Sequence, residues 1–225
     1  MSRLTPLKES ICARISKSIL QGSEHSRLLM TDRLPRDLHL KKTAKLKETR
    51  EAAVLVSLCN VAMVPSLLYT VRSSTLRSHA GHVSFPGGSI DVEDESVEAT
   101  ALREMHEEIG IEPKDVRTIG LGQTVFAVNG MLVHPVIGWI KPDLLDVDWG
   151  SQSSPDEVES VFTRPLHLLA APGYSSMETL SRKGVSVDMP VYGLSEDGSR
   201  GRETIWGLTA MITRAVLPEV MRHCH

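Results

Sequence analysis

The sequence predicts an α+β fold in which a mixed β-sheet is sandwiched between α-helices. Short apolar segments typical of strands occur on both sides of one strongly amphipathic helix, and a second long helix is expected at the end of the chain. The chain has 225 residues, of which 41% are hydrophobic, so it can bury a core of ordinary size. The sequence shows no internal repeat or low-complexity tract.

Strands are expected where apolar segments are short and bounded by turn-forming residues. Pro65 marks a hairpin-like connection between the first two, and Pro86-Gly87-Gly88 is expected to form a turn or loop after the third. The expected strands are Ala52–Leu58, Leu67–Val71, Val83–Phe85, Val116–Val128, Leu132–Ile140, Glu157–Phe162 and Val187–Tyr192.

The strongest predicted helix has clear signals at both ends. Asp94 or Ser96 can cap its start, and Gly110 is expected to end it. Shorter and longer helices are expected at Arg164–Ala170 and Gly207–Arg222. The buried stripe of the strongest helix is predicted to consist of Val97, Ala101, Leu102, Met105 and Ile109.

Residues 1–50 form a basic N-terminal extension in front of a domain predicted to span residues 51–225. The extension holds 12 Lys or Arg and 5 Asp or Glu, whereas residues 51–225 hold 13 and 23. Its first part predicts an amphipathic helix, in which Leu4, Leu7, Ile11, Ile15 and Ile19 recur at three- and four-residue steps.

Two hypotheses account for this basic helix: a mitochondrial transit segment, or a first helix that packs on the domain. The stretch Arg33–Arg50 is polar and basic, and it is expected to be a linker or a loosely held arm. Mitochondrial import is the leading hypothesis for the location of the protein, with the cytosol or the peroxisome as alternatives.

The composition argues against several classes of function. An acidic body with 4% aromatic residues is poorly suited to binding nucleic acid. The longest apolar run, around Ala52–Leu58, is too short to span a membrane. The three cysteines are far apart and form no CxxC pair, which argues against a disulfide framework and against a cysteine-based zinc site.

The chemistry is predicted to lie in an acidic segment. Between Asp91 and Glu112 there are nine carboxylates and one arginine. On a helix, Glu104 has Glu107 and Glu108 as its neighbours three and four positions on, so three carboxylates share one patch. A hard divalent cation such as Mg²⁺ would turn their repulsion into binding. The alternative is an exposed acidic helix without a metal.

Two neighbouring features favour the metal site. Gly87 and Gly88 lie just upstream, where the absence of side chains lets the backbone approach a metal or a phosphate. Arg103 has a candidate partner in Glu95 or Asp94, and this ion pair would tie the loop to the helix.

These residues resemble the Nudix box, written GX5EX7REUXEEXGU, where U is an aliphatic residue. The segment from Arg103 to Ile111 matches the second half of the box position for position. The first half is one residue longer than the standard form. In the standard box one glutamate stands six residues after the glycine and eight before the arginine. Here the residue six after Gly88 is Asp94, and the residue eight before Arg103 is Glu95.

The preceding stretch is similar to the motif of the coenzyme A diphosphatase branch of Nudix hydrolases. It runs from Leu67 to Ser73 and from Leu76 to Gly88, followed by Asp91, and the segment Glu203–Ala210 also resembles this branch. The sequence departs from the branch at His82, where glutamine or glutamate is usual, and at Ser89-Ile90, where a basic residue often stands.

The resemblance implies a Nudix fold and a metal-dependent hydrolase that splits coenzyme A or acyl-coenzyme A into 3′,5′-ADP and 4′-phosphopantetheine. The catalytic residues would be Glu104, Glu107, Glu108 and Arg103. Glu104 and Glu108 would hold Mg²⁺ or Mn²⁺, and Glu107 would be a further ligand or orient a water. Arg72, Arg77 and His79, together with Gly87 and Gly88, are the candidate contacts to the small nucleotide substrate. The alternatives are another nucleoside diphosphate substrate and an inactive binding module.

Other side chains are expected to have structural roles. His106 is predicted to face solvent, and Glu157 and Glu159 are predicted to lie on the exposed face of a strand. Trp206 and Cys59 are predicted to belong to the core.

Overall fold

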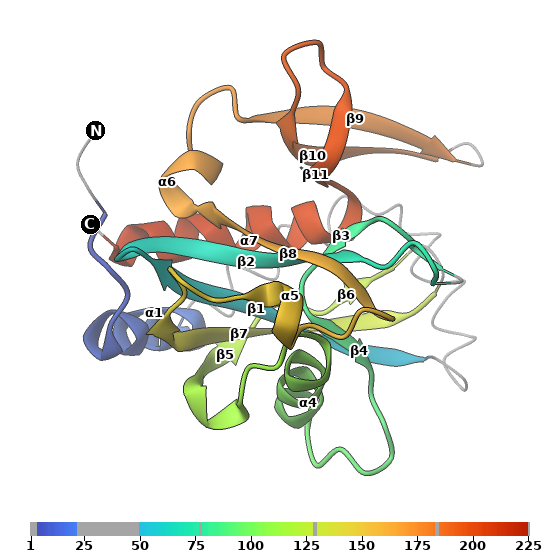
Figure 1. Ribbon diagram of the computed structural model, residues 1–225. Coiled ribbons are helices and arrows are strands. Elements are labelled where there is room, and N and C mark those ends of the chain that lie inside the picture. Colours follow the sequence, from blue (N-terminus) through green and yellow to red (C-terminus); the bar gives the residue numbers. More distant parts are fainter. Residues whose placement is uncertain (1–3, 22–49, 77, 128–129, 183–184, 225) are drawn as a thin grey trace.

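The computed structural model describes residues 4–21, 50–76, 78–127, 130–182 and 185–224. Within them, a mixed eight-stranded sheet is covered by helices on both faces, and an antiparallel three-stranded sheet lies beside it (Figure 1). The predicted arrangement of a mixed sheet between helices is therefore confirmed.

The main sheet is organised around β1 (Glu51–Val61). This strand runs antiparallel to β2 (Val64–Arg72) and parallel to β7 (Leu132–Asp143). Most of its residues are buried whichever face they point to, as expected for a strand covered on both sides. The remaining strands of this sheet are β3 (Val83–Ser84), β4 (Gly87–Ser89), β5 (Val116–Leu121), β6 (Val125–Phe126) and β8 (Val158–Pro165).

Each face of the main sheet has its own apolar core. On one face, α4 (Val97–Ile109) packs on β1 and β4 and buries Ala101, Met105 and Ile109. On the other face, α1 (Glu9–Gln21) and α7 (Gly207–His223) pack together and contribute to the larger core. The short helices are η2 (Pro113–Asp115), α5 (Trp149–Gln152) and α6 (Leu166–Leu169).

The second sheet consists of β9 (Ser175–Arg182), β10 (Val185–Leu194) and β11 (Arg200–Ile205). Only β10 was expected from the sequence, because the other two strands are largely polar and exposed and so lack the apolar signal. The strand predicted at Val116–Val128 is divided into β5 and β6, and Val128 itself lies outside the described residues.

The prediction of a turn or loop at Pro86-Gly87-Gly88 is wrong in part. Gly87 and Gly88 belong to β4, which pairs with β1 at Val54 and Ala53. A Cβ on Gly87 would lie 2.3 Å from the carbonyl oxygen of Ala53, so only glycine allows this close approach of the two strands.

The N-terminal helix packs on the domain. Leu7, Ile11 and Ile15 are at most 3% exposed, and they belong to the core that α7 shares with the sheet. The Leu7 amide donates to Oδ1 of the buried Asn60 at 2.8 Å, and Nδ2 of Asn60 donates back to the Leu7 carbonyl at 3.0 Å. The segment Arg33–Arg50, interpreted as a linker, lies outside the described residues except for Arg50.

Candidate functional site

The helix that carries the acidic cluster begins and ends where the sequence predicts. Oγ of Ser96 accepts a hydrogen bond from the Ala99 amide at 3.1 Å, and Gly110 ends the helix in the left-handed conformation with φ 72°. His106 points to solvent, as predicted, with 48% of its side chain exposed. The opposite, apolar side of the helix packs on the sheet, so the carboxylates are held in fixed positions.

Arg103 pairs with Asp94, one of its two predicted partners. Its Nε and Nη2 each donate to the Asp94 carboxylate at 2.9 Å. The Asp91 amide and the Thr100 hydroxyl also donate to Asp94, at 3.0 and 2.8 Å. The hydrogen bond from Arg103 is the main reason that the pKa of Asp94 lies well below its usual range. This four-part contact ties the loop before α4 to the helix.

Glu104 lies against β4, the strand that contains Gly87 and Gly88 and is called the glycine strand below. A Cβ built on Gly88 would be 2.3 Å from Oε1 of Glu104, so the carboxylate occupies the space that a side chain would need. Its other neighbour is Arg103, whose Nη1 donates to Oε1 at 3.1 Å. Burial raises the pKa of Glu104, against the opposing charge of Arg103.

Glu108 is the most deeply buried carboxylate of the cluster, with a side chain that is 4% exposed. Its Oε2 has no hydrogen-bond partner among the described residues. Burial raises the pKa of Glu108 to about 8, and the charges of Glu104 and Glu157 add to this effect. The nearby Arg72 and the Gly87 amide act in the opposite direction. A buried anionic oxygen without a partner is costly, so this position is suited to a proton or a cation.

Of the other predicted site residues, Arg72 contacts this cluster directly. Nη1 of Arg72, at the end of β2, lies 3.7 Å from Oε1 of Glu108. Glu107 is half exposed and accepts a hydrogen bond from Nη1 of Arg103 at 2.9 Å. His79 is exposed and its ring lies 5.3 Å from that of His82. Arg77 lies outside the described residues.

The structure brings one further carboxylate to the site. Glu157 is exposed, as predicted, but β8 begins at Val158, so Glu157 lies in the preceding turn and not within the strand. Its carbonyl accepts a hydrogen bond from the Ser73 amide at 2.9 Å, next to Arg72, and its charge acts on both Glu104 and Glu108. No local pattern in the sequence marks Glu157, because the pairing of β2 with β8 creates this proximity.

The carboxylates fit a divalent cation by their chemistry, although the side chains are not gathered around one point. In the described part of the chain, no group of three or more His, Cys, Asp or Glu is already arranged to hold a metal ion. Arg103 contacts Glu104 and Glu107, and Arg72 contacts Glu108. The unpartnered oxygen of Glu108 and the glycine backbone beside Glu104 are nevertheless what a hard, oxygen-binding cation requires. Glu104 and Glu108 are therefore the best-placed candidates for metal ligands.

Trp206 was predicted to be a core residue, and this is wrong. It is only partly buried, because it stands immediately before α7 at the end of β11, where its ring contacts His82 and Arg200. Cys59, by contrast, is fully buried as predicted. Glu159 pairs with Arg202 of β11, which links the main sheet to the second one.

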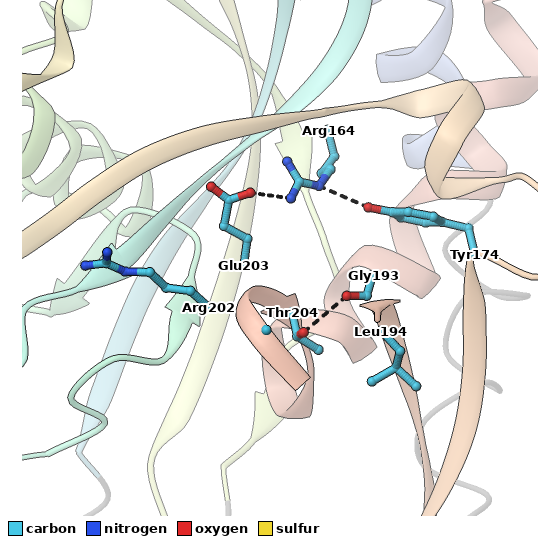
Figure 2. A pocket seen from close by; sticks show the side chains of 8 residues that line it. Arg164, Tyr174, Gly193, Leu194, Arg202, Glu203 and Thr204 are labelled. Atoms are coloured by element: carbon cyan, nitrogen blue, oxygen red, sulfur yellow. Dashed lines mark hydrogen bonds and ion pairs between the residues drawn. The ribbon is translucent and has the colours of Figure 1, made fainter. Parts of the chain in front are cut away.

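A separate pocket of about 450 Å³ lies between β8 and the second sheet. In it, Arg164 lies between Glu203 and Tyr174, and its Nε donates to the Tyr174 hydroxyl at 3.0 Å (Figure 2). The pocket lining includes none of the carboxylates of α4, so the pocket is distinct from the candidate metal site.

The chain matches one known domain family. A model described as the NUDIX domain matches residues 49–182. This range holds β1 to β9, including Arg72, the glycine strand and α4. It ends within the second sheet, before Arg200 and Trp206.

Curated relatives are similar over most of the chain. "Mitochondrial coenzyme A diphosphatase NUDT8" of Mus musculus is 38% identical over 185 residues, covering 81% of this chain and 84% of the relative. The Homo sapiens protein of that name is 39% identical over 178 residues, covering 78% and 72%. "Uncharacterized Nudix hydrolase NudL" of Citrobacter koseri is 37% identical over 199 residues, covering 88% and 97%.

Proposed function

The chain belongs to the Nudix hydrolase family, and from that premise we propose that it hydrolyses the diphosphate bond of coenzyme A or acyl-coenzyme A. Water adds to one phosphorus, and the bond from that phosphorus to the bridging oxygen breaks. The bridging oxygen leaves with the other phosphate, giving 3′,5′-ADP and 4′-phosphopantetheine or its acyl form. The names of two relatives and the motif between Leu67 and Gly88 support this choice of substrate.

The observation that carries the hydrolytic part is the buried carboxylate of Glu108, with one oxygen unpartnered and Glu104 nearby. Nudix hydrolases generally use divalent metal ions, and here Glu104 and Glu108 would hold Mg²⁺ or Mn²⁺. Glu107 would be a further ligand or orient a water. When bound, the metal neutralises charge on the diphosphate and lowers the pKa of the attacking water.

The chain's own residues supply the rest of the chemistry. If Glu108 held a cation in place of its contact with Arg72, the Arg72 guanidinium would be free to pair with two oxygens of a phosphate. The Asp94 contact holds Arg103, and so fixes the loop and the glycine strand against α4. Glu104, Glu107 and Glu157 are the candidates to accept the proton of the attacking water, since each lies in or beside the cluster.

One assay tests the proposed function. The purified protein is incubated with Mg²⁺ or Mn²⁺ and, separately, with coenzyme A, acyl-coenzyme A, NADH and ADP-ribose, with Glu108→Gln as the control. We expect the wild type to hydrolyse the coenzyme A compounds with the highest kcat/KM, and the variant to be inactive. Preference for NADH or ADP-ribose would indicate another Nudix activity, and no turnover at all would indicate a binding module.

The glycine strand provides a second test. In Gly88→Ala, the added methyl group would displace the Glu104 carboxylate, whereas in Gly201→Ala it meets no atom closer than 4.0 Å. We expect Gly88→Ala to weaken Mg²⁺ binding roughly 10- to 100-fold, because a displaced ligand loses its geometry. Titration calorimetry would measure this, and equal Mg²⁺ affinities in the two variants would contradict the role given to Glu104.

We also propose that the protein is mitochondrial. The support is the basic amphipathic segment at the N-terminus and the word "mitochondrial" in the names of two relatives. None of the helices in the described residues is long and apolar enough to cross a membrane. A fluorescent reporter fused to the C-terminus of the full chain should co-localise with a mitochondrial marker. A diffuse cytosolic or a peroxisomal signal would reject the proposal.

A further inference from the structure

A row of basic and aromatic side chains lies beside the candidate site, where the loop after β2 meets the end of β11. The ring of His82 lies 5.3 Å from that of His79 and 4.7 Å from the indole of Trp206. The guanidinium carbon of Arg200 lies over the same indole, 4.5 Å from the ring centroid. These four side chains are called the basic-aromatic row below.

Backbone contacts hold the row next to the carboxylates of α4. The Arg72 amide donates to the His82 carbonyl at 3.0 Å, and the side chain of Arg72 reaches Glu108. Oγ1 of Thr209 donates to the Val83 carbonyl at 2.9 Å, which fastens the start of α7 to the strand that follows His82. The row is therefore next to a candidate metal ligand, because His82 is hydrogen-bonded through its carbonyl to Arg72, and Arg72 contacts Glu108.

Positive charge gathers around His82. Burial lowers its pKa, and the charges of His79, Arg72 and Arg200 lower the pKa further, so all three act on the same ring. Arg200 pairs with Glu178, whose side chain is 34% exposed. A partly exposed ion pair of this kind contributes little stability, so an anionic ligand can displace the carboxylate at small cost. The domain as a whole is acidic, whereas two arginine side chains act on this one ring.

We propose that the basic-aromatic row binds the nucleotide end of the substrate, an adenosine that carries a 3′-phosphate. Trp206 and the two imidazoles offer aromatic surface for the adenine. Arg200 offers a charged donor and His79 an imidazole N–H for the phosphate, which is a separate anion from the diphosphate held near Arg72. The inference rests on the proposed function, and it names the residues that distinguish coenzyme A from diphosphates without this group.

The test compares coenzyme A with 3′-dephospho-coenzyme A, which differs only in the absence of the 3′-phosphate. The kcat/KM for both is measured for the wild type, for Arg200→Gln and for Arg222→Gln, an exposed arginine at the far end of α7. We expect the wild type to prefer coenzyme A at least about tenfold, the size of one charged hydrogen bond. Arg200→Gln should lose most of this preference through KM, whereas Arg222→Gln should keep it.

A second variant addresses stacking. Trp206→Leu removes the aromatic face, and it should raise KM for both compounds by a similar factor.

If Arg200→Gln keeps the wild-type preference, the row does not recognise the 3′-phosphate and the inference is wrong. If the wild type hydrolyses neither compound, the proposed function fails. The inference is then decided by calorimetry, in which it requires tighter binding of 3′,5′-ADP than of AMP, and equal affinities would overturn it.

Discussion

Replacing Glu108 with Gln should make the metal-free protein more stable at pH 8 while it abolishes activity. The wild-type carboxyl has a pKa of about 8 because it is buried, compared with an ordinary value of 4.5. Between these two pH values, the folded protein holds a proton that the unfolded chain has released. The free energy of unfolding therefore falls as the pH rises through this window, and the loss is complete above the folded pKa.

Glutamine removes this titration. The free energy of unfolding of the variant should therefore exceed that of the wild type by an amount that grows from pH 5 to pH 8. A shift of this size corresponds to several kcal/mol, but the buried amide must itself find hydrogen bonds, which leaves a net gain of roughly 2 kcal/mol at pH 8. Urea unfolding with EDTA present would measure the gain. Glu107→Gln is the matched control, because its side chain is 51% exposed and its i,i+4 contact with Arg103 stabilises only slightly.

The same variant tests whether Glu108 is a metal ligand or only a buried carboxylic acid. Mg²⁺ should raise the unfolding free energy of the wild type and have a much smaller effect on Glu108→Gln, because a ligand stabilises only the state that binds it. Loss of the metal should reduce kcat/KM by about 10³-fold or more. A variant that is as active as the wild type, or is stabilised equally by Mg²⁺, would rule out Glu108 as a ligand.

The sequence could predict α4 and the positions of its carboxylates because the signals are local. Ser96, Gly110 and the apolar stripe mark the helix, and the spacing of its carboxylates follows from the helical repeat. The choice between Asp94 and Glu95 as the partner of Arg103 could not be made, since the box is one residue longer than usual. The turn in which the Asp91 amide binds Asp94 decides it, and this contact is visible only in three dimensions.

Features that depend on contacts between distant segments were missed. Glu157 lies near the site because β8 pairs with β2. Trp206 lies outside the core because β11 ends beside the loop that carries His82. Both residues stand in segments whose local pattern favours an ordinary structural role. The polar strands β9 and β11 were missed for a related reason, because their partner is another exposed strand and not the core.

Removal of residues 1–21 should destabilise the domain severely, which is the largest stability effect that we expect. Leu7, Ile11 and Ile15 are buried against the sheet and α7, and burying each such side chain contributes about 1.5–3 kcal/mol. Their sum is comparable to the whole stability of a typical domain. The deletion would also leave both polar groups of the buried Asn60 side chain without the Leu7 backbone, at a further cost.

Point variants test this helix without deleting it. Ile11→Ala and Ile15→Ala should each lower the free energy of unfolding by about 2–5 kcal/mol, because they leave cavities in the core. Ser10→Ala is the matched control on the exposed face of the same helix, and its effect should stay within about 0.5 kcal/mol. Urea unfolding of the full chain measures all three.

The outcome also bears on the location of the protein. If import used this segment as a removable leader, cleavage after Gln21 would expose the core of the domain, so we expect mass spectrometry of the mitochondrial protein to find residues 5–21 retained. A mature chain that begins after Gln21 and unfolds at the same urea concentration as the full chain would show the opposite. The helix would then be a targeting signal that packs on the domain, and burial of its apolar face would contribute nothing to the free energy of unfolding.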